Sequence, residues 1–412
     1  MNLAGWNNLY TKCIAEQYEH FSSLSSIFLG YNLNIDLIAH IQEEDMHLLE
    51  EASFFSMLRE CMITGSAREV IISAEDRAIL RSLQFREQTM GGQAGIMANL
   101  FSLFPIHEIV LYTPMSEALT PFLSSTGAIR VPDEQCNLID PHKIRACNDP
   151  DYHFILEFKK GMKISGHTVP RDNRFIASCP LSFPDNSCDS LFDREYDYAI
   201  ISGFHLLEDT TPLSTSKRHV EALNRHTRVH YEYASTRASL RKSLIEYIHG
   251  FDSLGVNECE LNEILKILGE DPVETIMDIY EGIKKVKKTL HLNRIHFHHL
   301  GFYLTVIDSS KSPERTRSAL LYAALMAAAR AERGNLSSWK DAKVGLQAPL
   351  SAEGISKMSE LGSQLDYDDF VNSGIYEDHK EYLVFIPARI VEYPVKTVGL
   401  GDTISGLSFV GD

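Results

Sequence analysis

Residues 397–405 read Thr397-Val398-Gly399-Leu400-Gly401-Asp402-Thr403-Ile404-Ser405, which places two glycines and a carboxylate where a loop turns into a helix. Glycines let the backbone approach a ligand closely, and free N–H groups at a helix start favour an anionic phosphate. An aspartate beside that anion could take a proton from a hydroxyl that attacks the phosphorus. The stretch therefore predicts phosphoryl transfer to an alcohol. The same pattern also fits an ordinary helix start with Asp402 as its N-cap.

Other nucleotide-binding patterns do not occur in the sequence. Gly399, Gly401 and Gly406 do not form a G-x-G-x-x-G fingerprint, and there is no G-x-x-x-x-G-K-[ST] P-loop. Asp and Glu outnumber Lys and Arg by 56 to 39 over the 412 residues, so the net charge is −17. That charge argues against nucleic acid or an anionic membrane as a partner, whereas a phosphorylated small molecule needs only a local cationic pocket.

The cysteines and the N-terminal residues favour a cytoplasmic location. The seven cysteines are scattered and form no Cys-x-x-Cys pair, so we expect neither a disulfide framework nor a zinc site. The first residues show no basic region followed by an apolar run, as a secretory signal would. We expect a cytoplasmic protein, as a monomer or a small homo-oligomer.

Short apolar, β-rich runs alternate with helical patterns, which predicts an α/β fold with a mainly parallel sheet flanked by helices. The predicted strands are 26–30, 108–112, 154–158, 198–202, 228–233, 295–306 and 382–390. The predicted helices are 45–62, 95–103, 214–225, 237–249, 261–268, 273–288 and 315–333. Two stretches interrupt the alternation, and we interpret them as a smaller, discontinuous lid. The predicted division is a large domain of residues 1–37, 91–150 and 177–412 and a lid of residues 38–90 and 151–176.

Polar side chains follow several strands. Asn32, Asn34 and Asp36 alternate after the first strand, so they could face one cleft and bind a polyol, or form an Asn-rich turn with Asp36 as a helix cap. Gly91 and Gly92 open a helix and permit close approach of a sugar, although such a pair is also a common connector.

Charged residues suggest two further roles. Glu232 and Glu260 stand near predicted strand ends, where carboxylates can hold Mg²⁺ directly or through waters. For Glu260 the alternative is a favourable charge at a helix N-terminus. A basic group in the predicted lid could receive a phosphate or be a solvated loop; its members are Lys159, Lys160, Arg171 and Arg174.

Taken in order, these segments resemble the ADP-dependent phosphofructokinase/glucokinase family of the ribokinase-like superfamily, over nearly the whole chain. The matching segments are the Asn32/Asn34/Asp36 loop, 91–99, Asn173-Arg174-Phe175-Ile176, 202–205, His230-Tyr231-Glu232, 257–260, 294–303, 387–389 and 397–405. The resemblance implies a ribokinase-like α/β domain with a β-rich lid that closes over the substrates. It also implies transfer of the β-phosphoryl group of ADP to a sugar hydroxyl with Mg²⁺, leaving AMP.

The resemblance also assigns residues. Asp402 matches the catalytic base, and the amides from Gly399 to Asp402 match the anion hole. Glu232 and Glu260 match residues that organise magnesium. The implied nucleotide-binding residues are Thr397, Val398, Gly399, Leu400 and Gly401. The implied phosphate clamp is Arg174, and the implied sugar-side residues are Asn32, Asn34, Asp36, Glu69, Gly91, Gly92, Lys159 and Asn173.

Two sugars remain candidates for the phosphoryl acceptor. Glu69 aligns with a lid glutamate that contacts glucose in this family, whereas the lid cations suit fructose 6-phosphate. Both together suggest a phosphofructokinase that also accepts glucose. The alternatives are a glucokinase only, an ATP-dependent relative, or a catalytically silent ADP or sugar sensor on the same fold.

Overall fold

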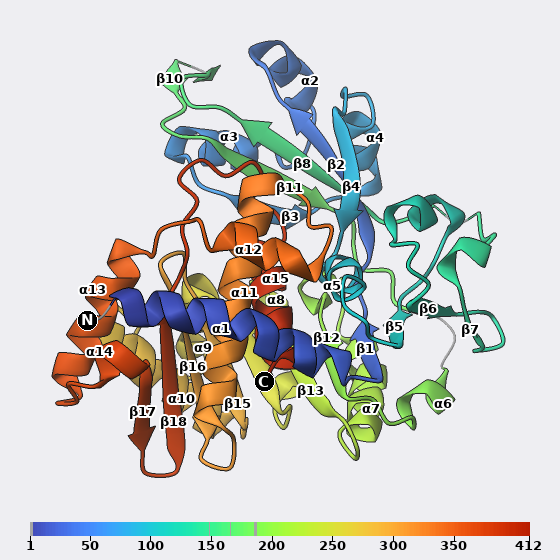
Figure 1. The fold of residues 1–412 in the computed structure, drawn as a ribbon. Helices are drawn as coiled ribbons and strands as arrows, with labels where there is room; N and C mark the ends of the chain where they lie inside the picture. The colour runs from blue at the N-terminus through green and yellow to red at the C-terminus, as the bar shows by residue number, and fades with distance from the viewer. Residues whose placement is uncertain (1–2, 148, 165, 185–187) are drawn as a thin grey trace.

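The computed structural model describes residues 3–147, 149–164, 166–184 and 188–412. It contains a large sheet of eleven strands, a smaller sheet of five and a two-stranded pair. In Figure 1 the small sheet lies above the large domain, and β1 continues directly into β2 of the small sheet. The predicted α/β class, with a mainly parallel sheet and a smaller β-rich part, is confirmed.

The large sheet is parallel through its centre and antiparallel at both edges. Its central strands are buried throughout, as expected where helices cover both faces. In spatial order the strands are β17 (Ile375–Asp378), β18 (Glu381–Pro387), β16 (Phe302–Asp308), β15 (Arg294–His298), β14 (Ser253–Val256), β13 (Arg228–Glu232), β12 (Tyr198–Ile201), β1 (Ser26–Gly30), β5 (Glu108–Tyr112), β6 (Ile129–Pro132) and β7 (Leu138–Ile139).

The small sheet takes its strands from two separate parts of the chain, residues 34–91 and 152–178. Its spatial order is β3 (Arg68–Ile71), β11 (Asn173–Ser178), β8 (Tyr152–Phe158), β2 (Asn34–His40) and β4 (Glu87–Gly91). The separate pair is β9 (Lys163–Ile164) with β10 (His167–Thr168). Strand β2 places Asp36 in an extended segment, so the helix-cap interpretation of Asp36 is wrong.

Helix α11 packs against α1 and α15, and α15 packs against α5; α7 to α10 form a second group in which consecutive helices touch. The helices are α1 (Leu3–Ser22), α2 (Met46–Leu49), α3 (Phe55–Thr64), α4 (Ala74–Leu80), α5 (Gln93–Phe101), α6 (Asp189–Phe192), α7 (Thr211–Leu223), α8 (Ala238–Ile248), α9 (Glu258–Ile267), α10 (Ile276–Thr289), α11 (Pro313–Arg333), α12 (Ala342–Gly345), α13 (Ala352–Gln364), α14 (Phe370–Ser373) and α15 (Leu400–Val410). Within the described ranges no helix is long and apolar enough to cross a membrane.

Helix α11 is the central support of the first group. The Ser312 hydroxyl accepts the N–H of Arg315, Pro313 occupies the first turn, and Gly334 follows the last residue. These are favourable start and stop signals, and the alanine-rich interior has high helix propensity. Because the alanines are small, α15 and α1 can pack closely against α11.

Three predictions need correction. The single strand predicted over 295–306 is two antiparallel strands, β15 and β16, joined by a turn at 299–301. The helix predicted over 45–62 is interrupted, because the Asp76 carboxylate accepts hydrogen bonds from the Ser53 N–H (2.7 Å) and hydroxyl (2.6 Å). Cys136 and Cys188, distant in sequence, form a disulfide, contrary to the expectation of none.

Candidate active site

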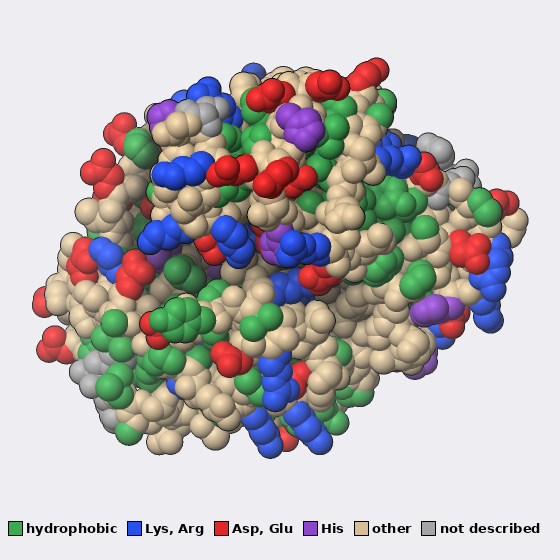
Figure 2. Space-filling model, turned by 90° about the horizontal axis from the view of Figure 1, so that it is seen from above, with side chains coloured by type: hydrophobic (Ala, Val, Ile, Leu, Met, Phe, Trp, Pro, Cys, Tyr) green, Lys and Arg blue, Asp and Glu red, His purple; other side chains and the backbone are tan. Residues whose placement is uncertain are grey.

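The predicted site residues gather where strands β1, β13 and β14 end, beneath the small sheet. A cleft of about 1110 Å³ opens there, and its walls come from the small sheet and from residues 333–335 and 392–398. Lys159, Asn173, Arg174, Thr397 and Val398 line this cleft. Figure 2 shows Lys and Arg side chains gathered beside a hollow near the middle of this face. The protein, although acidic overall, therefore has a locally cationic cleft.

Helix α15 begins at the predicted motif. Gly399 caps the helix with φ of 74°, a left-handed conformation that glycine adopts without strain. The first helical hydrogen bond runs from the Thr403 N–H to the Gly399 carbonyl (3.1 Å). The N–H groups of Leu400, Gly401 and Asp402 precede it and have no acceptor within the helix. Free N–H groups at a helix start favour an anion, so this turn is a candidate anion site. The interpretation of Asp402 as the N-cap is wrong, because Gly399 is the N-cap.

Arg330, at the end of α11, lies against this turn and is not among the predicted site residues. Its Nε donates to the Val398 carbonyl (3.2 Å), and a Cβ added to Gly399 would lie 2.7 Å from its guanidinium. Arg330 adds a positive charge beside the anion site. The only sequence signal for it is a charged residue within the apolar run Ala327-Ala328-Ala329-Arg330-Ala331.

Asp402 stands in the first turn of α15 and is held in an environment that disfavours its charge. Burial raises its pKa to about 6, the Arg330 guanidinium opposes the rise, and the Glu69 carboxylate adds to it. A carboxylate that is ionised near neutral pH but is a stronger base than a free aspartate suits a general base.

The sugar-side residues form a compact polar group. Asn34 Nδ2 donates to Asp36 Oδ1 (2.7 Å), and the Ser202 hydroxyl donates to Asn32 Oδ1 (3.0 Å). Asn34 Oδ1 is buried and accepts no hydrogen bond from the described residues, which leaves it for a ligand hydroxyl. Burial raises the pKa of Asp36 to about 7, with the Asn34 amide opposing the rise.

Gly91 and Gly92 let this group pack. A Cβ at Gly91 would lie 2.0 Å from Asp36 Oδ1, and one at Gly92 would lie 2.7 Å from the Asn32 carbonyl. Gly92 also has φ of 76°. Both glycines are therefore required by close packing of the polar group, whether or not a sugar also contacts them.

Glu69 and Arg174 reach the site from the small sheet. The Ser178 hydroxyl donates to Glu69 Oε1 (2.5 Å), and His205 Nε2 lies 3.8 Å from Oε2. Burial alone would raise the pKa of Glu69, but the nearby His205 and His153 hold it below its ordinary value. Arg174 Nη1 donates to the Thr397 hydroxyl (2.8 Å), which joins the small sheet to the loop before α15.

The other predicted lid residues lie at the cleft with partners of their own. Asn173 Nδ2 donates to the Gly65 carbonyl (2.8 Å), and the exposed Lys159 pairs with Asp172 (3.2 Å). Lys396 is a further cation that the sequence analysis does not include; burial lowers its pKa, and Arg330 and Asp36 are among the charges acting on it.

Glu232 and Glu260 are both buried. Glu232 Oε2 accepts the Ser405 hydroxyl and lies 3.1 Å from His230 Nε2, while burial raises the pKa of Glu232 well above its ordinary value. Glu260 accepts the Asn257 N–H (2.7 Å) in a capping box, so it is a charge in the first turn of α9 as the structural alternative states, and its magnesium role stays a prediction. Burial raises the pKa of Glu260 to about 8. Asp402 is among the charges acting on both carboxylates.

These two carboxylates fit a hydrated cation. The described residues contain no group of three or more His, Cys, Asp or Glu side chains that could hold a metal ion alone. Mg²⁺ commonly takes one or two carboxylates and completes its shell with waters and substrate phosphates. Two buried carboxylates near the anion site match that pattern, because a nearby cation would favour their ionised forms.

Comparisons with known proteins show which sequences and folds this chain is similar to. The family described as "ADP-specific Phosphofructokinase/Glucokinase conserved region" matches residues 25–411. The chain is 31% identical to the ADP-dependent glucose/glucosamine kinase of Pyrococcus furiosus, covering 99% of this chain and 98% of that one. It is 29% identical to the ADP-specific phosphofructokinase of Methanosarcina acetivorans, covering 100% and 97%. A solved "ADP-dependent kinase complex with fructose-6-phosphate and ADPbetaS" superposes with a TM-score of 0.90 at 28% identity, covering 100% and 98%.

Proposed function

This chain belongs to the ADP-specific phosphofructokinase/glucokinase family, whose members are ADP-dependent sugar kinases, and we propose that its acceptor is fructose 6-phosphate. The products would be fructose 1,6-bisphosphate and AMP. The observation that carries the phosphoryl-transfer chemistry is the position of Asp402, a half-buried carboxylate with a raised pKa in the first turn of α15 and beside Arg330. The charge of the cleft carries the choice of acceptor.

Each group of site residues would have its own role in the reaction. Asp402 would accept the proton of the attacking sugar hydroxyl, and Asn34 and Asp36 would hold the sugar. The N–H groups of residues 400–402, together with Arg330, would stabilise charge on the transferring phosphoryl group. Glu232 and Glu260 would hold Mg²⁺ directly or through its waters, and the ion would offset the negative charge of the phosphates.

The small sheet would serve as a lid over these groups, with the predicted segments 38–90 and 151–176 at its centre. The hydrogen bond from Arg174 to Thr397 supports this role, because it joins the lid to the anion-binding loop. A closed lid would exclude water and limit wasteful hydrolysis of ADP.

Fructose 6-phosphate is favoured over glucose by the charge of the cleft. Lys159, Arg171 and Arg174 line it from the small sheet, and Arg333 and Lys396 line the opposite wall. A second phosphate needs such cationic partners, whereas glucose carries no charge to match them. Glu69 supports glucose as a secondary acceptor, since its carboxylate acts electrostatically on both Asp36 and Asp402.

Glu69→Gln tests this assignment of the acceptor. We expect kcat/KM for glucose to fall by roughly tenfold or more, in line with loss of a charge-assisted hydrogen bond, while the value for fructose 6-phosphate changes little. Initial rates with each sugar, measured on the same preparations, check the ratio. An equal fall for both sugars would show that Glu69 does not discriminate between them, and a wild-type preference for glucose would contradict the proposed acceptor.

The pH profile tests the base. Asp402 must be ionised to accept a proton, and its pKa is about 6. We therefore expect loss of the Asp402 carboxylate to add an acid limb to kcat/KM below about pH 6, with a slope of about tenfold per unit, because this parameter reports the free enzyme. Arg330 holds the pKa of Asp402 down, so Arg330→Met should move the acid limb to higher pH. An acid limb that stays in place in Arg330→Met would assign the titration to another group.

A further inference from the structure

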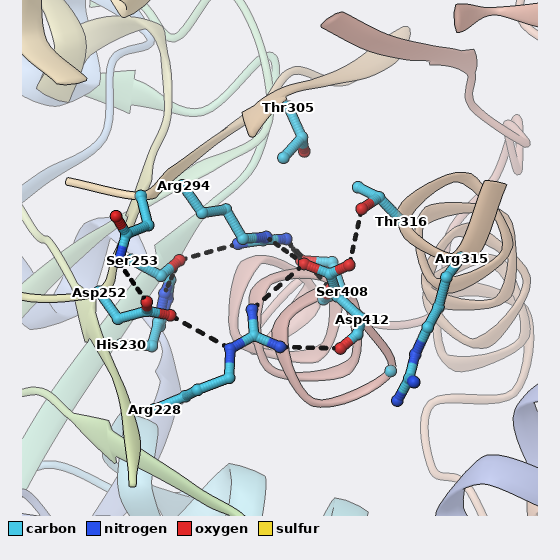
Figure 3. Close-up of polar contacts among 12 residues, drawn as sticks. Arg228, His230, Asp252, Ser253, Arg294, Thr305, Arg315, Thr316, Ser408 and Asp412 are labelled. Atoms are coloured by element: carbon cyan, nitrogen blue, oxygen red, sulfur yellow. Dashed lines mark hydrogen bonds and ion pairs between the residues drawn. The ribbon is translucent and has the colours of Figure 1, made fainter. Parts of the chain in front are cut away.

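A chain of buried hydrogen bonds leads from Glu232 away from the cleft, and Figure 3 shows its continuation from His230 to Asp412. His230 Nε2 lies 3.1 Å from Glu232 Oε2, and His230 Nδ1 lies 2.8 Å from the Ser253 hydroxyl oxygen. The same Ser253 oxygen lies 3.0 Å from Arg294 Nη1. His230, Ser253 and Arg294 are each 0% exposed, so no solvent molecule competes for these bonds.

Arg294 also fastens the far end of the helix that carries Asp402. Its Nη2 donates to the Ser408 carbonyl (3.1 Å) and hydroxyl (3.0 Å), and its Nε lies 3.4 Å from Asp412 Oδ2. Arg228 shares the Asp412 carboxylate at 3.4 Å but contacts Asp252 rather than Ser253. Arg294 thus touches both α15 and the chain of bonds to Glu232.

The direction of the hydrogen bonds along the chain follows from the donors available. A guanidinium can only donate, so the Ser253 oxygen accepts from Arg294. Ser253 is 0% exposed, and among the described residues His230 Nδ1 is the one acceptor within hydrogen-bond distance of its hydroxyl, so the hydroxyl donates to Nδ1. An imidazolium carries a proton on both nitrogens, so a His230 ring that accepts at Nδ1 is neutral and carries its proton on Nε2. That proton faces Glu232 Oε2 and the Ser405 hydroxyl oxygen, which both lie 3.1 Å from Nε2.

We infer that Arg294 is a positioning residue: through Ser253 it holds His230 in the orientation that donates to Glu232, while it anchors helix α15. The inference rests on the proposed function in one respect, since Glu232 serves there to organise Mg²⁺. Two parts of the site, the metal-organising carboxylate and the helix of the base, would thereby be held by one buried cation. Removing a residue that hydrogen-bonds to a metal-binding side chain commonly lowers metal affinity by roughly 10–100-fold.

The test reads the His230 tautomer directly by ¹⁵N NMR of histidine-labelled protein, with a His230→Gln variant to assign the signal. We expect the Nε2-protonated form in the wild-type protein. Ser253→Ala removes the donor to Nδ1 but leaves Arg294 its bonds to Ser408 and leaves Glu232 as acceptor at Nε2. We therefore expect the Nε2-protonated form to remain and the Nδ1 resonance to move to the shift of an imidazole nitrogen without a hydrogen bond. An Nδ1-protonated wild type, or an Nδ1 resonance that is unchanged in Ser253→Ala, would overturn the inference.

Binding of ADP by calorimetry, at a series of Mg²⁺ concentrations, gives a second readout that needs no turnover. We expect Ser253→Ala to raise, by about tenfold, the Mg²⁺ concentration that gives half of the maximal increase in ADP affinity. The control is Ser318→Ala, which removes a buried hydroxyl that donates to Glu16 (2.7 Å) between α1 and α11. Equal half-maximal Mg²⁺ concentrations in wild type and Ser253→Ala would overturn the inference. If no AMP forms yet both readouts hold, the proposed function fails and the role of Arg294 stands.

Discussion

Asp402→Asn is expected to lower kcat by about 10²–10⁴-fold, the usual effect of removing a positioned acid–base group. The amide keeps the shape of the carboxylate but cannot take the proton of the sugar hydroxyl. The N–H groups of the first turn of α15 remain, so ADP should bind with nearly unchanged affinity. Single-turnover rates together with ADP titration by calorimetry separate these two effects.

A matched substitution controls for loss of a half-buried carboxylate charge. Asp378 accepts hydrogen bonds from Tyr280 (2.9 Å) and Lys284 (2.7 Å) at the β17 edge of the large sheet. Asp378→Asn should retain wild-type kcat even if it lowers stability. Near-normal turnover by Asp402→Asn would remove Asp402 as the base, and loss of ADP binding would instead make it a residue of the anion site.

Arg174→Ala is expected to lower kcat/KM for fructose 6-phosphate by about 10²–10³-fold, the loss seen when a donor to a developing charge is removed. Arg174 contributes the bond to Thr397 that joins the small sheet, the proposed lid, to the loop before α15, and its charge lies in the cationic cleft. Both the closed lid and the phosphate contact would be weakened. Steady-state rates with fructose 6-phosphate and with glucose measure the effect on each acceptor.

Two variants test whether position or charge matters at Arg174. Lys160→Ala also removes one positive charge from the small domain, but Lys160 is exposed and does not line the cleft. We expect Lys160→Ala to behave as wild type and Arg174→Lys to recover only part of the activity, because lysine cannot reproduce the guanidinium geometry. Equal losses in Arg174→Ala and Lys160→Ala would indicate a general field effect and not a clamp.

The parts of the site that follow from local chemistry could be predicted from the sequence. The turn at Gly399 and the helix start at Leu400 require only a glycine at positive φ and N–H groups without acceptors. Both features are determined by residues adjacent in sequence. Strands β1 and β5 match their predicted bounds because a buried parallel strand is a short apolar run. Helix α1 carries a comparable signal, since Trp6, Tyr10, Cys13, Gln17 and Phe21 recur at helical spacing, yet it is absent from the predicted helices.

The parts that depend on tertiary packing could not be predicted in this way. Arg330 is brought to Gly399 by the packing of α11 against α15, 69 positions apart in sequence. The disulfide joins Cys136 and Cys188 across 52 positions, and no local pattern pairs them. The break in the helix predicted over 45–62 depends on Asp76, which captures Ser53 from a later helix. In each case the deciding partner is remote in sequence.

The central claim is most directly tested by measuring AMP release from ADP and Mg²⁺, with fructose 6-phosphate or glucose as acceptor and ATP as a comparison donor. We predict that AMP forms from ADP only when a sugar is present, in equal amount to the sugar phosphate produced, and faster with fructose 6-phosphate. Tight ADP binding without AMP in either mixture would contradict the account and favour a sensor. Turnover with ATP alone would contradict the ADP specificity.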